Sequence, residues 1–267
     1  MNKLNSFYKD RFNSFLIHLS KAKGLKKEDV HKLRVDIKNI RSLLLLVDAF
    51  EIEGETVGKI LKQLQSIFKY SGRLRSIHVS RSLVENYELK GEKPIVTNLE
   101  DPRSKYEDEL SKRLGKFKIL KFQKRVDVLN EALQLVNIDN VREKADRIIL
   151  DELDLIYKLW ASSRGEEYYH DIRKFFKIIK SILHLLTNLI DDEKLKSELS
   201  IVNETETILG NWHDRDVLDK KLSKMQSTSP NSEFKSLVRE IKNRNRSEKN
   251  NLSKEFKKKM LTHFLKH

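Results

Sequence analysis

The chain has 267 residues, of which 38% are hydrophobic, and its 54 Lys and Arg outnumber its 40 Asp and Glu to give a formal net charge of +14. This apolar content suffices for one large or two small domains, and the charge favours a polyanionic partner such as nucleic acid, polyphosphate or an anionic membrane. The lack of cysteine excludes disulfides, thiolate catalysis and cysteine-based zinc sites. No apolar run is long enough to span a membrane and the N-terminus lacks a secretory signal, so we expect a cytoplasmic protein without a membrane partner.

Apolar residues recur at three- and four-residue steps along almost the whole chain, which predicts an all-α protein. The breaks between helices fall at helix-ending residues such as Gly24, Gly54 and Pro230. The longest break, residues 90–102, contains one glycine and two prolines and is predicted to be a loop. In chain order, the predicted helices span residues 3–21, 27–51, 55–89, 103–119, 121–136, 140–161, 166–190, 193–225 and 231–265.

The second predicted helix contains the sequence HKLRVDIKNIR, in which basic residues follow a histidine at offsets of three, seven and ten. At about 100° per residue, these offsets place all four side chains within an arc of about 80°. They form the first basic stripe, which consists of His31, Arg34, Lys38 and Arg41. An apolar stripe runs one position earlier in the sequence, so we expect this helix to pack into a bundle with the basic stripe along the border of its buried face.

The predicted helix over residues 166–190 repeats this pattern in the sequence HDIRKFFKIIK. Its residues form the second basic stripe, which consists of His170, Arg173, Lys177 and Lys180. A glycine follows each stripe at a corresponding distance, Gly72 and Gly210, and each is followed three residues later by a basic or histidine side chain, Arg75 and His213. We infer a single domain made of two repeats, residues 1–136 and 137–267. One basic stripe is typical of a solvated helix border, whereas a repeated stripe headed by histidine favours a ligand.

The pattern H-x2-R-x3-K-x2-[RK] in both halves, with the element LGNWHDRDV in the second half, resembles the CHAD family, which is named for its histidine-bearing α-helical domain. The resemblance covers about residues 3–265. It implies an all-α fold of two four-helix-bundle-like halves that are related by pseudo-twofold symmetry around a basic groove. It also implies a non-catalytic protein without a cofactor that binds inorganic polyphosphate, often on polyphosphate granules.

The resemblance assigns phosphate binding to ten positions of this chain. These are His31, Arg34, Lys38, Arg41, Arg75, His170, Arg173, Lys177, Lys180 and His213. The chain departs from the family pattern at Ser76 and His78, where acids are favoured, so we expect Arg75 to be held less rigidly than its counterpart. Lys180 replaces the more usual arginine, which keeps the charge but loses bidentate geometry.

Five further basic residues lie near the ends of the two halves and are secondary candidates for the groove. They are Arg113, Lys116, Arg239, Lys242 and Arg246. The competing interpretation is that these residues belong to solvated helix faces.

Motifs for catalysis or resident metals are missing from the sequence. It contains neither a GxxxxGK[ST] phosphate loop nor an HExxH metal pair. Asp214 and Asp216 could contact a divalent cation that accompanies phosphate, but ion pairs with Arg215 or with a stripe residue are the favoured interpretation. We therefore predict neither catalytic residues nor a metal site.

Two other ligand classes stay open. RNA or another nucleic acid could use the same charge and the basic tail RNRSEKNNLSKEFKKKM, but RNA recognition usually needs exposed aromatic rings. The aromatic residues Phe7, Phe68, Trp160 and Phe176 instead lie at core periodicity. A scaffold for an acidic protein would use the positive charge without needing the repeated histidines.

Overall fold

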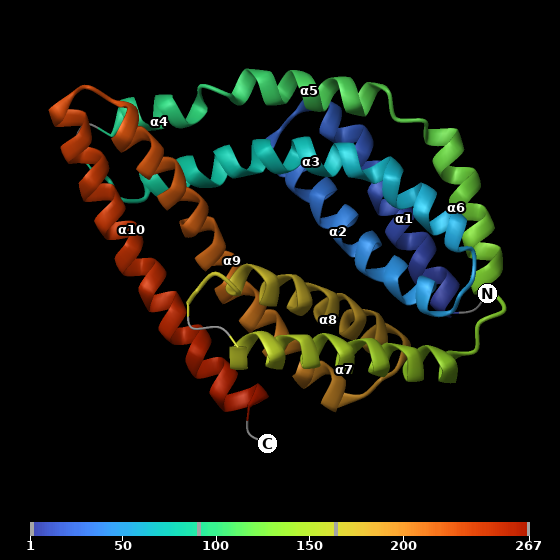
Figure 1. Ribbon diagram of the computed structural model, residues 1–267. Coiled ribbons are helices and arrows are strands. Elements are labelled where there is room, and N and C mark those ends of the chain that lie inside the picture. The colour runs from blue at the N-terminus through green and yellow to red at the C-terminus, as the bar shows by residue number, and fades with distance from the viewer. Residues whose placement is uncertain (1–2, 90–91, 163–164, 266–267) are drawn as a thin grey trace.

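The computed structural model describes residues 3–89, 92–162 and 165–265, which are all-α as predicted and contain no strand (Figure 1). Within these residues, no helix is long and apolar enough to cross a membrane. A 3₁₀ turn, η1 (Ala22–Gly24), and a final π-helical turn, η2 (Met260–Phe264), complete the secondary structure. The α-helices are α1 (Lys3–Lys21), α2 (Lys27–Ala49), α3 (Gly54–Glu85), α4 (Lys93–Glu100), α5 (Arg103–Gly115), α6 (Ile119–Leu133), α7 (Ile138–Ser162), α8 (Tyr169–Leu189), α9 (Glu193–Thr228) and α10 (Ser232–Lys259).

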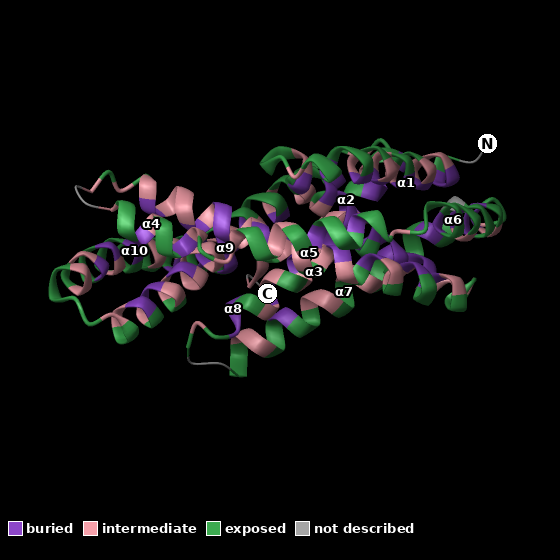
Figure 2. Ribbon diagram, turned by 90° about the horizontal axis from the view of Figure 1, so that it is seen from above, coloured by how far each residue is buried: buried purple, intermediate pink, exposed green. Residues whose placement is uncertain are grey.

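The two helices that carry the basic stripes are amphipathic in the way the sequence predicts. Val30, Leu33 and Ile37 of α2 are buried, and Ile172 and Phe176 of α8 are buried in the same register. Figure 2 shows buried residues following one side of the helices while exposed residues follow the other. Helix α2 packs against α1, α3 and α8, and α8 packs against α7 and α9. Contact between α2 and α8 therefore brings the borders of the two apolar faces together.

The long helices α3 and α9 run from the main hydrophobic core into a second, smaller core (Figure 1). Their first parts bury side chains in the main core, whereas Val84 of α3 and Leu218 and Leu222 of α9 belong to the smaller one. Helices α4 and α10 complete this second core. Residues 1–136 contain α1 to α6 and residues 137–267 contain α7 to α10, but the division into two repeats and their twofold relation stay predictions.

The loop predicted for residues 90–102 is wrong, because Lys93–Glu100 form α4. Residues 90 and 91 of that segment lie outside the described residues. Pro94 stands in the first turn of α4, where its missing N–H costs no intrahelical hydrogen bond. Ile95 and Leu99 are one turn apart and both are buried in the second core. Burial in this core, which α4 shares with α3, α9 and α10, thus outweighs the local signal of the prolines. The other predicted helices are confirmed, with small shifts at their ends.

The second core gives a direct test of α4. We expect Ile95→Ala to lower the free energy of unfolding by roughly 2–4 kcal/mol, because Ile95 is fully buried and its truncation leaves a cavity. Leu150→Ala is the control, since Leu150 is 66% exposed on α7. Urea denaturation followed by circular dichroism measures both changes. Equal and small effects would mean that residues 93–100 do not pack as a helix.

Candidate functional site

Contact between α2 and α8 places the central residues of the two basic stripes beside each other. The positive charges of Lys38 and Arg34 both act on Lys177, and the charge of Arg173 acts on Lys38. The four central side chains are half-buried, whereas the outer residues His31, Arg41 and His170 are exposed. The half-buried side chains are Arg34, Lys38, Arg173 and Lys177. The structure thus joins, in one cluster, charges that are far apart in the sequence.

Helix α3 holds Arg34 in a fixed position. Nη1 of Arg34 donates to the backbone oxygen of Phe68 at 2.7 Å and to Oγ of Ser71 at 3.2 Å. The guanidinium also lies 4.5 Å from the centre of the Phe68 ring. A Cβ atom at Gly72 would come within 2.8 Å of Nη1, so this glycine is required for the close approach of Arg34 to α3.

Helix α9 holds Arg173 in a related way. Nε of Arg173 lies 3.6 Å from Oε1 of Glu206, and its side chain is only 14% exposed. A Cβ atom at Gly210 would lie 3.3 Å from Nη2 of Arg173. The repeated glycines therefore have one physical role, which is to make room for the arginine of the neighbouring stripe.

Two residues that the sequence interpretation missed complete these arginine sites. Phe68 and Glu206 each stand one helical turn before their glycine, and each contacts two residues of one stripe. Phe68 lies under Arg34 and also under Arg41, whose guanidinium is 5.0 Å from the ring centre. Glu206 pairs with Arg173 and with Lys180, whose Nζ is 3.4 Å from Oε2. The shared position relative to the glycine was the signal that could have identified them.

Burial and, after it, the crowding of positive charge lower the pKa values of the central lysines. Burial, followed by the charges of Arg173 and Lys38, lowers the pKa of Lys177 to about 7, although Glu206 acts in the opposite direction. Burial, followed by the charges of Arg34 and Arg173, lowers the pKa of Lys38 to about 8, against Glu206 and Asp214. Burial also lowers the pKa of Arg34, with Arg75 and Arg173 as the next causes. The cluster therefore has more positive charge than its two nearby acids compensate.

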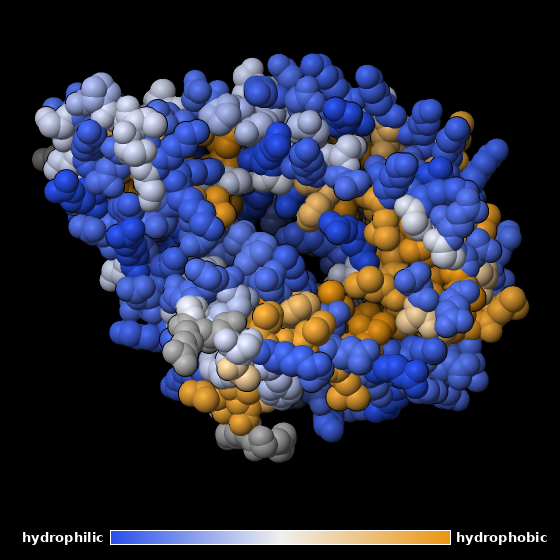
Figure 3. Space-filling model, viewed as in Figure 1, coloured by the Kyte–Doolittle hydropathy of each residue, from blue (hydrophilic) through white to orange (hydrophobic). Residues whose placement is uncertain are grey.

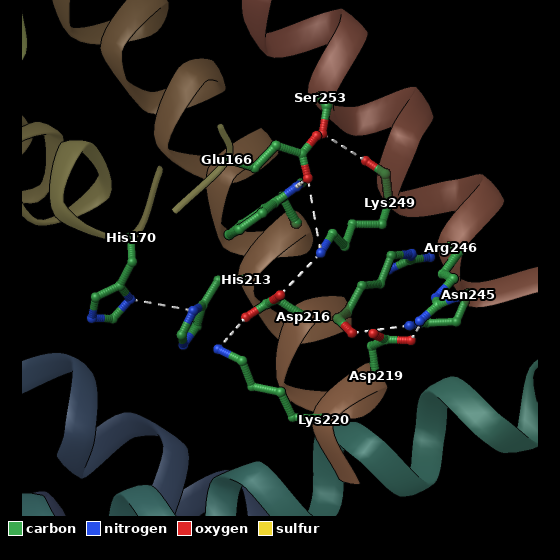
Figure 4. A network of polar contacts seen from close by, with 12 residues as sticks. Glu166, His170, His213, Asp216, Asp219, Lys220, Asn245, Arg246, Lys249 and Ser253 are labelled. Carbon is green, nitrogen blue, oxygen red and sulfur yellow. Dashed lines mark hydrogen bonds and ion pairs between the residues drawn. The ribbon is translucent and has the colours of Figure 1, made fainter. Parts of the chain in front are cut away.

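The histidines lie at the edge of this cluster. Nδ1 of His170 and Nδ1 of His213 share a hydrogen bond of 3.3 Å (Figure 4). Burial and the neighbouring charge of Arg173 lower the pKa of His213 to about 4. Burial and then the charge of Arg75 lower the pKa of His31, which places Arg75 near the first stripe. Arg75 itself is half-buried and has no carboxylate within 4.0 Å among the described residues.

Asp216 of the element LGNWHDRDV takes part in ion pairs, but with partners that the sequence did not predict, whereas Asp214 has no ion pair among the described residues. Asp216 binds Nζ of Lys249 at 3.0 Å and Nζ of Lys220 at 2.8 Å (Figure 4). Arg215, the predicted partner, instead pairs with Glu248 of α10. These contacts fix α9 against α10 behind His213. The described part of the chain contains no group of three or more His, Asp or Glu side chains placed to hold a metal ion.

The secondary candidates do not join the stripes. On α10, Nε of Arg246 pairs with Asp219 at 3.1 Å and Lys242 contacts Gln226, while Arg239 is exposed. Arg113 and Lys116 line a separate pocket beside α3, α5 and α6. Within the described residues, no hydrogen bond, ion pair or ring contact connects any of the five to a stripe residue.

The face of the molecule seen in Figure 3 is hollowed near its middle. Hydrophilic residues surround the hollow toward α3 and α9, and hydrophobic residues gather on the side of α1 and α6. The hollow lies between the helices that carry or support the two stripes.

Comparison with known proteins identifies the family, because the model of the CHAD domain matches residues 10–223. The chain belongs to the CHAD domain family. Among solved structures, the CHAD domain from the plant Ricinus communis is similar, with a TM-score of 0.75 and 14% identity, over 97% of this chain and 91% of that one. PptA from Streptomyces chartreusis has a TM-score of 0.63 and 13% identity, over 97% and 98% of the two chains. No curated protein matches significantly. The resemblance predicted from the sequence is thus confirmed for family and fold.

The glycine beside Arg34 allows a matched test within one helix of this CHAD domain. Gly58→Ala should raise the free energy of unfolding by up to ~1 kcal/mol, because alanine favours helix and nothing lies within 4 Å of the new Cβ. Gly72→Ala should have a free energy of unfolding about 1 kcal/mol lower than that of Gly58→Ala, because its Cβ displaces Arg34 from Phe68 and Ser71. Chemical denaturation measures both variants. Equal gains would contradict the position described for Arg34.

Proposed function

We propose that this CHAD domain binds inorganic polyphosphate along its two basic stripes and acts as a non-catalytic scaffold or granule-associated module in the cytoplasm. The observation that supports the proposal most is the half-buried cluster formed by Arg34, Lys38, Arg173 and Lys177. Burial at this contact, followed by the repulsion between its charges, lowers the pKa values of both lysines. A polyanion placed against this cluster would supply the missing negative charge.

A linear phosphate polymer suits the shape of the cluster. Each stripe extends over ten residues of helix, or about 15 Å at ~1.5 Å per residue. The two arginines are already held by α3 and α9, so little side-chain freedom is lost when their guanidinium groups bind phosphate oxygens. Repeating charge along the polymer allows binding in many registers. Divalent cations could accompany the polymer and reduce its own repulsion.

Nucleic acid is the alternative ligand, but the aromatic residues give it little support. Binding of single strands usually combines positive charge with exposed rings on which bases stack. Phe176 is fully buried, and Phe68 lies under the guanidinium groups of Arg34 and Arg41. The ring nearest the stripes is therefore already occupied. The stripes therefore offer cations for phosphate groups but no free aromatic ring on which a base could stack, which favours polyphosphate over nucleic acid.

The proposal predicts a preference among phosphate polymers. Titration of the protein with polyphosphate, single-stranded RNA and duplex DNA, at matched phosphate concentration and near-physiological salt, should give the tightest binding for polyphosphate. Arg34→Gln and Arg173→Gln should each weaken that binding about tenfold or more, because each removes a charged, oriented phosphate contact. Tighter binding to either nucleic acid would refute the proposal.

Two exposed lysines at the end of α10 provide the control for these variants. Lys257→Gln and Lys258→Gln remove the same charge per substitution but lie outside both stripes. Circular dichroism checks that all four variants keep their helices. If the tail variants lose as much affinity as the stripe variants, only the bulk charge of the protein matters.

The lowered pKa of Lys177 predicts how binding depends on pH. In the protein without ligand, Lys177 has a pKa of about 7. Neighbouring phosphates should raise this pKa, so binding above pH 7 should be accompanied by uptake of a proton. Affinity should therefore fall as the pH rises from about 7 to 9. Lys177→Arg should reduce this slope to the part that comes from Lys38, because arginine stays charged, whereas Lys257→Arg should leave it unchanged. Isothermal titration calorimetry in two buffers of different ionisation enthalpy measures the proton uptake, and no uptake at pH 8 would remove Lys177 from the site.

A further inference from the structure

A second basic site lies outside the two stripes, in a pocket of about 320 Å³. The pocket is formed by α3, the end of α5, the connecting segment 116–118 and the start of α6. It has five cationic side chains in its lining and no acidic one. The cations are Arg113, Lys116, Lys118, Lys121 and Arg125.

This pocket and the stripes lie on opposite faces of α3. Gln63 and Ser66 of α3 line the pocket, whereas Phe68 and Ser71 contact Arg34. At about 100° per residue, the middle of the first pair and the middle of the second pair lie roughly 140° apart around the helix. An anion in the pocket therefore would not contact the stripe residues.

Little of the positive charge in the pocket is neutralised by the protein. Nη1 of Arg125 donates to Oε1 of Gln63 at 2.7 Å, a neutral partner that fixes the guanidinium without compensating it. Arg113 reaches Glu109 at 3.4 Å, but Lys112 shares that carboxylate at 3.6 Å. Among the described residues, Lys116, Lys118 and Lys121 have no carboxylate within 4.0 Å.

The pocket has a rigid base. Phe117, which belongs to its lining, packs against Phe15 at 5.7 Å and against Phe122 at 5.4 Å between ring centres. Phe15 and Phe122 are both fully buried in the main core. The guanidinium of Arg113 lies over the ring of Tyr70 at 5.4 Å. The cations therefore surround a preformed hollow, which favours a ligand over a merely solvated surface.

We propose that this pocket is a second anion site, independent of the stripes, that takes a compact anion bearing several phosphate groups. Its volume is at the lower end of the range for small-molecule sites, which suits a few phosphate groups and excludes a folded polymer. Arginine and lysine together offer forked and point-like donors to phosphate oxygens. The same chemistry is found in a short condensed phosphate and in a polyphosphorylated small molecule.

The test uses tripolyphosphate and inositol hexakisphosphate as separate probes in calorimetric titrations of the full chain. The pocket variant is Lys118→Glu with Lys121→Glu, two exposed positions three residues apart. The matched control is Lys254→Glu with Lys257→Glu, which has the same spacing and charge change on the exposed face of α10. Circular dichroism verifies the fold, and Arg173→Gln serves as the stripe variant.

We expect at least one probe to bind with a dissociation constant that rises at least tenfold in the pocket variant and less than threefold in the control and stripe variants. The tighter probe then identifies the source of the phosphates. The inference is overturned if neither probe binds, if the control loses as much affinity as the pocket variant, or if only the stripe variant loses affinity. The last outcome would leave polyphosphate binding by the stripes intact, so the two proposals fail separately.

Discussion

The structure depends on holding like charges together at the contact between α2 and α8. Placing Lys177 at this contact costs roughly a few kcal/mol, as the lowering of its pKa to about 7 indicates, and this cost comes first from burial and then from the charges of Arg173 and Lys38. Each fully buried Leu, Ile or Phe contributes roughly 1.5–3 kcal/mol, so two or three such residues offset one crowded lysine. Both helices bury many more than that on the faces that border the stripes. Apolar packing therefore holds the positive cluster together against its own repulsion.

The two stripes reach this arrangement by different chemistry at equivalent places. In the first half, a backbone oxygen and an aromatic face hold Arg34, and neither carries a compensating charge. In the second half, the carboxylate of Glu206 serves both Arg173 and Lys180. The first stripe therefore keeps more of its positive charge available. If the domain binds a polyanion as proposed, the strongest attraction should come from the side of Arg34 and Lys38.

Much of this site could be predicted because helical periodicity is a local property. The spacing of His31, Arg34 and Lys38 defines one helix face, and the repeated glycines mark where a neighbour comes close. Predicting α4 required knowing that Ile95 and Leu99 meet distant helices, which local composition does not reveal. The contributions of Phe68 and Glu206 were also hidden, because unlike residues stand at the same position before the two glycines. The partners of Asp216 depend on how α9 meets α10, which is a tertiary fact.

The same crowding that identifies the site also links binding to stability. Folding lowers the pKa of Lys177 from about 10.5 to about 7, so the unfolded chain binds this proton more tightly than the folded protein does. The resulting cost in stability grows as the pH falls from about 10.5 to about 7 and is constant below that. Replacing Lys177 with an apolar residue of similar length should accordingly relieve repulsion on Arg173 and stabilise the free protein. It would also remove one of the charges on which a polyanion depends. The presence of four half-buried cations at this contact thus agrees better with the proposed ligand than with the needs of the fold alone.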